Sequence, residues 1–136
     1  MKTVFTDTFY FLSPFNPAEQ THRKAVAFTS ENNVRIVTTD WVLTELAEGL
    51  ARSRRGRAEF ISTLADLQAD PDVKIEPFHP QLMSEGIRLY GSRADKEWSL
   101  TDCISFVVMQ RDGITEALTG DHHFEQAGFV ALLNQD

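Results

Sequence analysis

The stretch VRIVTTDWVLTELAEGL, residues 34–50, changes its hydrophobic period halfway along, and this change decides the fold class. Val34 to Thr39 is rich in β-branched residues, which favour a strand, and the preceding pair Asn32-Asn33 is typical of a turn. Thr39 or Asp40 then caps a helix whose apolar stripe, at spacings of four, consists of Val42, Leu46 and Leu50. A strand that leads directly into a helix is the building unit of α/β proteins.

The same alternation continues along the chain. The other runs that favour strands are Thr3 to Thr6, Val73 to Phe78, Glu116 to Thr119 and Val130 to Leu133. The other predicted helices begin at Asn16-Pro17 and end near Glu31, extend from Arg57 to Asp70, begin at Pro80, and extend from Leu100 to Asp112 with a stop at Gly113. We therefore expect a Rossmann-like, three-layer α/β/α sandwich around a mostly parallel sheet of about five strands. No linker divides the chain, so residues 1–136 are expected to form one domain.

Composition narrows the class of protein. A chain of 136 residues is large enough to bury a sizeable core without disulfides, and its lone Cys103 has no partner for an internal one. The apolar run after Met1-Lys2 is broken at Asp7, and no window approaches the roughly 18 apolar residues of a membrane helix, so a cytoplasmic protein is expected. The 13 Lys and Arg residues against 20 Asp and Glu residues argue against nucleic-acid binding by a broad positive field. Any such contact must be local, or helped by a metal or a basic partner.

Acidic residues follow several of the predicted strands or open the helices after them. In open α/β sheets the ligand site lies beyond the carboxyl ends of the strands, so such acids are expected to converge. One pair of carboxylates about 4 Å apart costs on the order of 4 kcal/mol at an effective dielectric near 20, and a divalent cation removes that cost. All-oxygen ligation favours Mg²⁺ or Mn²⁺ and indicates phosphodiester hydrolysis. The acids concerned are Asp7, Glu45, Asp102 and Asp121.

Each acid also has an ordinary structural interpretation. Asp102 follows Ser99 by three residues and would complete a helix capping box, and we assign Asp40 to capping alone. Glu45 fits a solvated helix face. Asp7 is harder to explain structurally, because an acid that ends a buried strand has little structural purpose. Spacing alone leaves both interpretations open.

Asp121 is followed by two histidines, His122 and His123, and this trio is a possible zinc site. A zinc phosphoesterase would need further acids and histidines in the preceding strands and a following domain, yet only 15 residues follow Asp121. We therefore predict that Asp121 is the metal ligand and that the histidines are its neighbours rather than ligands.

Four blocks of sequence together resemble a PIN domain, the ribonuclease fold of bacterial VapC-type toxins. They are VFTDTFYFLSPFNPAEQTHRKA, TTDWVLTELAEGL, ADKEWSLTDCISFVVMQRDGI and EALTGDHHFEQAGF, and the second half of the match, around WSLTDCISF and LTGDHHFEQAGF, is the most specific. The resemblance covers nearly the whole chain. It implies that Asp7, Glu45, Asp102 and Asp121 bind Mg²⁺ or Mn²⁺ and cut single-stranded or looped RNA. It also implies a cognate antitoxin partner and a homodimer.

Other residues are weaker candidates. The hydroxyls of Thr8, Ser105 and Thr119 could hydrogen-bond the acids or metal-bound waters, or cap the local backbone instead. His22 is a possible contact on the substrate side. The run RSRRGR contains four basic residues, Arg52, Arg54, Arg55 and Arg57. This run could bind RNA phosphates, or it could be a solvated connection between two helices.

Two rival functions come from other classes. The chain could be a catalytically silent PIN-like module that binds RNA or protein, although the presence of all four acids speaks against this. A phosphomonoesterase of the haloacid dehalogenase type would need Asp-x-Asp after the first strand, but Phe9 occupies the second of these positions. Neither the RNA target nor the number of metal ions follows from the sequence.

Overall fold

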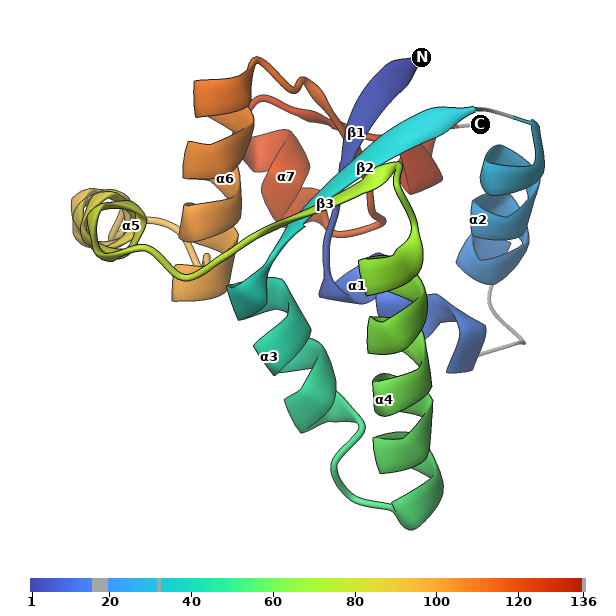
Figure 1. The fold of residues 1–136 in the computed structure, drawn as a ribbon. Coiled ribbons are helices and arrows are strands. Elements are labelled where there is room, and N and C mark those ends of the chain that lie inside the picture. Colours follow the sequence, from blue (N-terminus) through green and yellow to red (C-terminus); the bar gives the residue numbers. More distant parts are fainter. Residues whose placement is uncertain (16–19, 32, 136) are drawn as a thin grey trace.

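In the computed structural model, which describes residues 1–15, 20–31 and 33–135, five parallel strands form one sheet (Figure 1). Their order across the sheet is β3-β2-β1-β4-β5, and their bounds are β1 (Lys2–Thr6), β2 (Val34–Thr39), β3 (Val73–Glu76), β4 (Glu116–Leu118) and β5 (Val130–Ala131). The predicted strands and the parallel α/β fold are confirmed. The last three strands are shorter than predicted. β3 ends before Pro77, which has no N–H for the ladder, and a 3₁₀ turn (Leu132–Asn134) follows β5.

Helices connect the strands and cover both faces of the sheet (Figure 1). The connections are α1 (Thr8–Leu12), a 3₁₀ turn (Ser13–Phe15) and α2 (Gln20–Glu31) from β1 to β2, α3 (Asp40–Gly49) and α4 (Arg54–Ala69) from β2 to β3, α5 (Pro80–Ser92) and α6 (Leu100–Asp112) from β3 to β4, and α7 (His122–Gln126) from β4 to β5. In Figure 1, α2 lies on one side of the sheet and α6 and α7 lie on the other. None of the helices among the described residues is long and apolar enough to span a membrane.

The helix ends correct two predictions. The cap of α3 is Thr39, whose hydroxyl accepts from the Val42 N–H at 3.1 Å, whereas the Asp40 carboxylate accepts from the Phe78 N–H at 3.0 Å. Asp40 therefore ties α3 to the segment after β3 and caps nothing. Helix α4 begins at Arg54 rather than Arg57, because Ser53 caps it with a 2.9 Å bond from the Gly56 N–H.

Other helix predictions are confirmed or fall outside the described part. Helix α5 begins at Pro80, and α6 ends at Gly113, whose φ of 67° is the left-handed conformation that glycine tolerates. The predicted helix start at Asn16-Pro17 lies outside the described residues, as does the side chain of His22. The short helix α1 was not predicted.

Strand β1 is buried on both of its faces. Val4 belongs to a cluster with Ala25 of α2, while Phe5 belongs to a larger cluster that includes Phe106 of α6 and Phe124 of α7. Because successive side chains of a strand point to opposite faces, this alternation covers the strand with helices on both sides.

The strand order creates a switch point between β1 and β4. The chain passes from β1 outward to β2 and β3, and then returns to place β4 on the other side of β1. In open α/β sheets, ligands bind beyond the carboxyl ends of the strands at such a point. The residues that follow β1 and β4 are therefore those around Asp7 and Asp121.

Candidate active site

Asp7 lies directly after β1, where its carboxylate caps α1. Its Oδ1 accepts from the Tyr10 N–H at 3.3 Å, and its Oδ2 accepts from the Thr119 hydroxyl at 2.8 Å. The residue is only 6% exposed. Burial raises the pKa of Asp7 to about 8, and the charges of Asp121 and Asp102 add to this effect, while the two hydrogen bonds oppose it. Asp7 is therefore a buried carboxyl group on which the charges of two other acids act.

Asp102 lies in the first turn of α6 and belongs to the capping box predicted from the sequence. Its Oδ2 accepts from the Ser99 N–H at 3.1 Å, and the Ser99 hydroxyl accepts from the Asp102 N–H at 3.0 Å. The same Oδ2 lies 2.9 Å from Nδ1 of His123. Burial raises the pKa of Asp102, and the charge of Asp121 raises it further. Asp102 therefore caps the helix and also belongs to the acidic cluster.

Asp121 follows β4 and caps α7. Its Oδ1 accepts from the His123 N–H at 2.9 Å, and its own N–H donates to the Thr119 hydroxyl oxygen at 3.0 Å. Because Thr119 also donates to Asp7, this one hydroxyl joins the first acid to the loop that carries the fourth. The sheet edge thus fixes Asp7 and Asp121 relative to each other.

Glu45 is joined to the cluster through a threonine. The Thr8 hydroxyl donates to Oε1 of Glu45 at 2.6 Å, and Thr8 is the neighbour of Asp7 in the sequence. The acids therefore lie close enough that the charges of Asp102 and Asp121 raise the pKa of Asp7, and the bond from Thr8 links Glu45 to this cluster.

The three predicted hydroxyl groups have different roles. Thr8 and Thr119 contact acids, as described above. Ser105 does not, because its hydroxyl donates to the Thr101 carbonyl oxygen at 2.9 Å. This is the local backbone bond that the sequence left open as the alternative, and a role of Ser105 beside metal-bound water stays a prediction.

His123 was not assigned any contact from the sequence. Its Nδ1 lies 2.9 Å from Asp102 and 3.5 Å from Asp121, and its side chain is 18% exposed. His122, whose side chain is 69% exposed, lies farther from Asp121 at 3.8 Å. Potential ligand atoms of Asp121, His122 and His123 lie within 4.8 Å of one another. Only the packing of α7 against α6 reveals the contact between His123 and Asp102, because 21 residues separate them in the chain.

Aromatic packing holds α7 in this position. The Phe124 ring lies 4.9 Å from that of Phe106 in an edge-to-face arrangement and is fully buried. The Trp98 indole N–H donates to the Gln126 side chain at 2.9 Å. Since Phe106 belongs to α6 and Trp98 precedes it, these contacts fix the loop of Asp121 against the start of α6.

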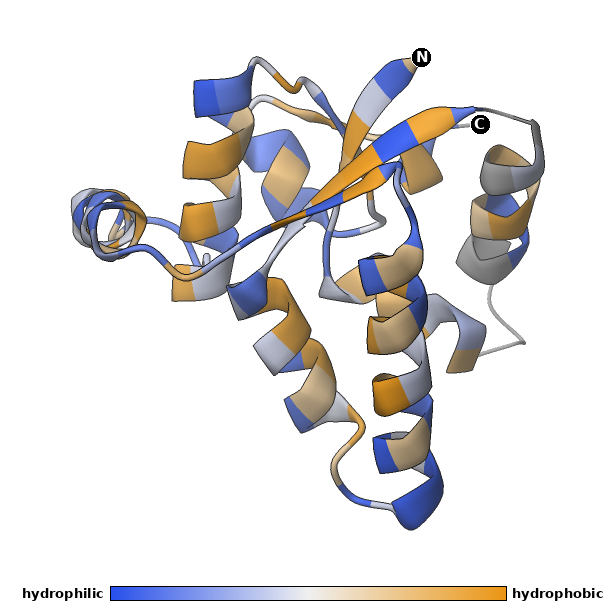
Figure 2. Cartoon of the chain, in the orientation of Figure 1, coloured by the Kyte–Doolittle hydropathy of each residue, from blue (hydrophilic) through white to orange (hydrophobic). Residues whose placement is uncertain are grey.

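The arginine run lies at the turn between α3 and α4, where Figure 2 shows a hydrophilic tip. All four arginines are exposed. Arg55 pairs with Glu59 at 3.8 Å, and Arg57 donates to the Ala51 carbonyl oxygen at 2.9 Å. The run is therefore partly the first turn of α4 rather than only a connection between helices.

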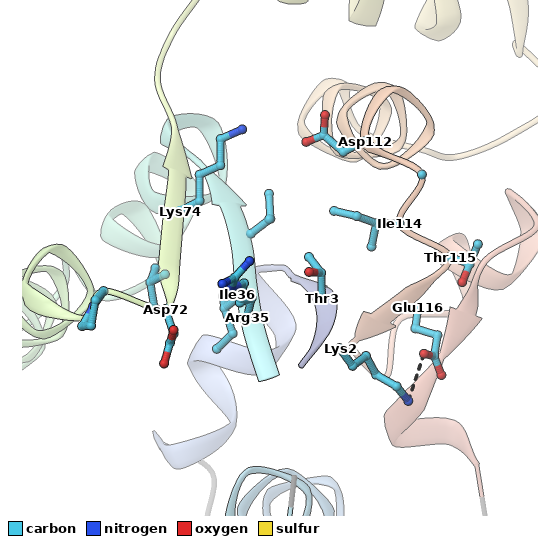
Figure 3. Close-up of a pocket in the computed structure, with 14 residues that line it drawn as sticks. Lys2, Thr3, Arg35, Ile36, Asp72, Lys74, Asp112, Ile114, Thr115 and Glu116 are labelled. Carbon is cyan, nitrogen blue, oxygen red and sulfur yellow. Dashed lines mark ion pairs between the residues drawn. The ribbon is translucent and has the colours of Figure 1, made fainter. Parts of the chain in front are cut away.

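A cavity of about 540 Å³ lies at the opposite end of the sheet from Asp7 (Figure 3). It is lined by the first residues of β1, β2 and β3 and by the segment after α6. Two of the acids that line it have basic partners: Glu116 pairs with Lys2 at 3.0 Å, as Figure 3 shows, and Asp112 pairs with Arg111 at 2.9 Å. The cavity therefore offers no cluster of carboxylates comparable with that around Asp7.

Comparisons with known proteins agree with this arrangement. The chain is 27% identical over 129 residues to the 23S rRNA-specific endonuclease VapC20 of Mycobacterium tuberculosis, a match that covers 95% of this chain and 97% of the relative. The crystal structure of VapC20, described as a Sarcin-Ricin loop cleaving toxin, superimposes with a TM-score of 0.82 at 26% identity and covers 93% of this chain and 96% of that one.

A more distant structure supports the fold alone. VapBC2 of Rickettsia felis, bound to a DNA fragment from its promoter, matches with a TM-score of 0.65 at 14% identity, over 95% of this chain and 96% of that one. The family model described as PIN domain matches residues 4–130, which include all four acids. The chain belongs to the PIN-domain family.

Proposed function

We propose that this PIN domain is a metal-dependent endoribonuclease and the toxin of a toxin–antitoxin pair. The observation that carries the proposal is the convergence of Asp7, Asp102 and Asp121 at the switch point of the sheet, two of them with raised pKa values. Such a buried acidic cluster is unfavourable without a cation and gives a structural protein no benefit.

The donor set fits Mg²⁺ or Mn²⁺. The charges of Asp102 and Asp121 both act on the Asp7 carboxyl group, and the high pKa of Asp7 reflects burial that a cation would compensate. Asp7, Asp102 and Asp121 would hold the ion, and Glu45 would act beside them. When bound, the ion polarises a phosphoryl oxygen, makes water a better nucleophile and stabilises the departing 3′ oxygen.

The chain's own residues orient these acids. Thr119 and the Tyr10 N–H fix the Asp7 carboxylate, and Thr8 fixes Glu45. Nδ1 of His123 lies 2.9 Å from Asp102 and 3.5 Å from Asp121, so this ring would hold the two acids together when no cation is present. We assign His123 as a positioning residue of this site.

The relative VapC20 suggests the first substrate and partner to test. RNA containing the sarcin-ricin loop is the target named for that protein. The formal charge of −7 fits a basic antitoxin better than an unassisted RNA interface. In this proposal the exposed arginines of the α3–α4 turn (Arg52, Arg54, Arg55 and Arg57) contact RNA phosphates.

The test is cleavage of a sarcin-ricin loop oligonucleotide and of total RNA by antitoxin-free protein in Mn²⁺ or Mg²⁺. We expect Asp7→Asn to abolish cleavage while the protein stays folded, and the matched control Asp66→Asn, an exposed acid on α4, to cleave normally. Intact RNA with the wild-type protein, when calorimetry shows that the ion is bound, would refute the enzymatic proposal. It would favour the silent binding module.

The two histidines provide a second test. His123→Gln is expected to weaken metal binding and cleavage by roughly tenfold or more, whereas His122→Gln leaves both nearly unchanged. If the two substitutions have equal effects, His123 has no special positioning role. If both together remove metal binding as completely as Asp121→Asn, the histidines are ligands.

The arginine turn is tested through salt dependence. Replacing Arg52 and Arg54 with Gln should weaken RNA binding and reduce the slope of log affinity against log salt, because fewer counterions are released. An unchanged slope would show that this turn does not contact RNA.

A further inference from the structure

Phe9 is an exposed aromatic residue of α1. Its ring is 37% exposed, whereas the next aromatic residues of the same helix pack inward: Phe11 is 6% exposed, and Tyr10 contacts it edge-to-face at 5.5 Å. An exposed phenylalanine gains little from the core. This one lies two residues after Asp7, next to the threonine that holds Glu45.

The ring of Phe9 rests on the backbone of Gly120. A Cβ at this glycine would lie 2.6 Å from Cζ and 2.7 Å from Cε1 of the phenylalanine, closer than a real contact allows. Gly120 stands between Thr119, which binds Asp7, and Asp121 itself. The ring therefore packs against the segment that carries the fourth acid, and Phe9 itself lies two residues after the first acid.

We propose that Phe9 stacks on a nucleobase next to the phosphate that is cut, and this inference rests on the proposed ribonuclease function. Proteins that read single-stranded or looped RNA commonly stack unpaired bases on aromatic rings. Stacking does not depend on charge, so it supplies binding where an acidic cluster repels the RNA backbone. A ring fixed by Gly120 needs no rearrangement to receive a base.

The test combines substitutions of Phe9 with removal of single bases from the RNA. Binding and cleavage are measured for antitoxin-free protein with the oligonucleotide used above and with derivatives that lack one base at each position flanking the cut. Phe9→Leu should raise KM roughly tenfold with little change in kcat, and Phe9→Tyr should restore the wild-type value. The control is Tyr90→Leu, since Tyr90 is also an exposed aromatic residue, at 54%, but belongs to α5.

One derivative should lose affinity for the wild-type protein by a similar factor, and Phe9→Leu should add no further loss on that derivative. Independent losses on every derivative, or an unchanged KM with weaker antitoxin binding, would overturn the inference and make Phe9 a protein contact. If the losses of Phe9→Leu and of one derivative overlap but no RNA is cut, Phe9 stacks on a base and the proposed ribonuclease function is refuted. If RNA is cut but the two losses are independent, the ribonuclease function stands and the stacking is refuted. RNA that neither binds nor is cut would refute both.

Discussion

Replacing Asp7 with Asn should stabilise the metal-free protein while it abolishes cleavage. The folded pKa of about 8 lies above the ordinary value of 3.8, so between these pH values the folded state holds a proton that the unfolded state has lost. Each pH unit then lowers the free energy of unfolding by about 1.4 kcal/mol. From pH 5 to pH 7, Asp7 therefore lowers the free energy of unfolding by about 3 kcal/mol, and Asn has no such effect.

The assay is urea unfolding in a chelator at several pH values from 5 to 8, for wild type, Asp7→Asn and the surface control Asp66→Asn. The advantage of Asp7→Asn over wild type should grow with pH by about 1.4 kcal/mol per unit and level off near pH 8, where the folded carboxyl group ionises. Asp66→Asn should follow the wild type. If the difference between Asp7→Asn and wild type is the same at pH 5 and pH 7, Asp7 is already ionised in the metal-free fold and the electrostatic argument fails.

Two further pairs of substitutions test the bond from Thr8 to Glu45 and the packing of α5. Thr8→Val removes the hydroxyl that donates to Glu45 at 2.6 Å, so kcat for RNA cleavage should fall roughly tenfold. Thr8→Ser keeps this hydrogen bond and should keep the wild-type kcat. If both variants cleave at the same rate, the bond from Thr8 to Glu45 does not contribute to the reaction. In α5, a Cβ at Gly86 would lie 2.3 Å from Cγ1 of Ile104, whereas Gly91 has nothing within 4 Å. Gly86→Ala should therefore lower the free energy of unfolding by about 1–3 kcal/mol, whereas Gly91→Ala should raise it by roughly 0.5–1 kcal/mol. If thermal melting shows the same change in Tm for both variants, this packing argument is contradicted.

The sequence predicted the elements whose local pattern agrees with their tertiary setting. The β-branched run of β2 and the capping box of α6 are examples, because both are determined by neighbours in the chain. Asp40 shows where this approach fails. Its spacing permits a cap, but the Phe78 N–H reaches it from a segment 38 residues away, and Thr39 takes the cap instead.

The sequence identified the acids of the candidate site, but it did not predict the hydrogen bonds and contacts that link them. The carboxyl ends of parallel strands locate Asp7 and Asp121 from the order of elements alone. The bond from Thr119 to Asp7 and the contact of His123 with Asp102 depend on how close two packed segments come. From the sequence, Asp102 could be either a helix cap or a residue of the site. In the structure its Oδ2 accepts from the Ser99 N–H of the cap and also contacts His123 of the site.

The bond between Thr119 and Asp7 joins residues 112 positions apart. During translation, a nascent chain that has exposed β1, α3 and even α6 still lacks the segment that completes the acidic cluster. The hydrogen bond from Thr119 to Asp7 can therefore form only when β4 and the loop after it join β1, so the acidic cluster is completed late in the synthesis of the chain.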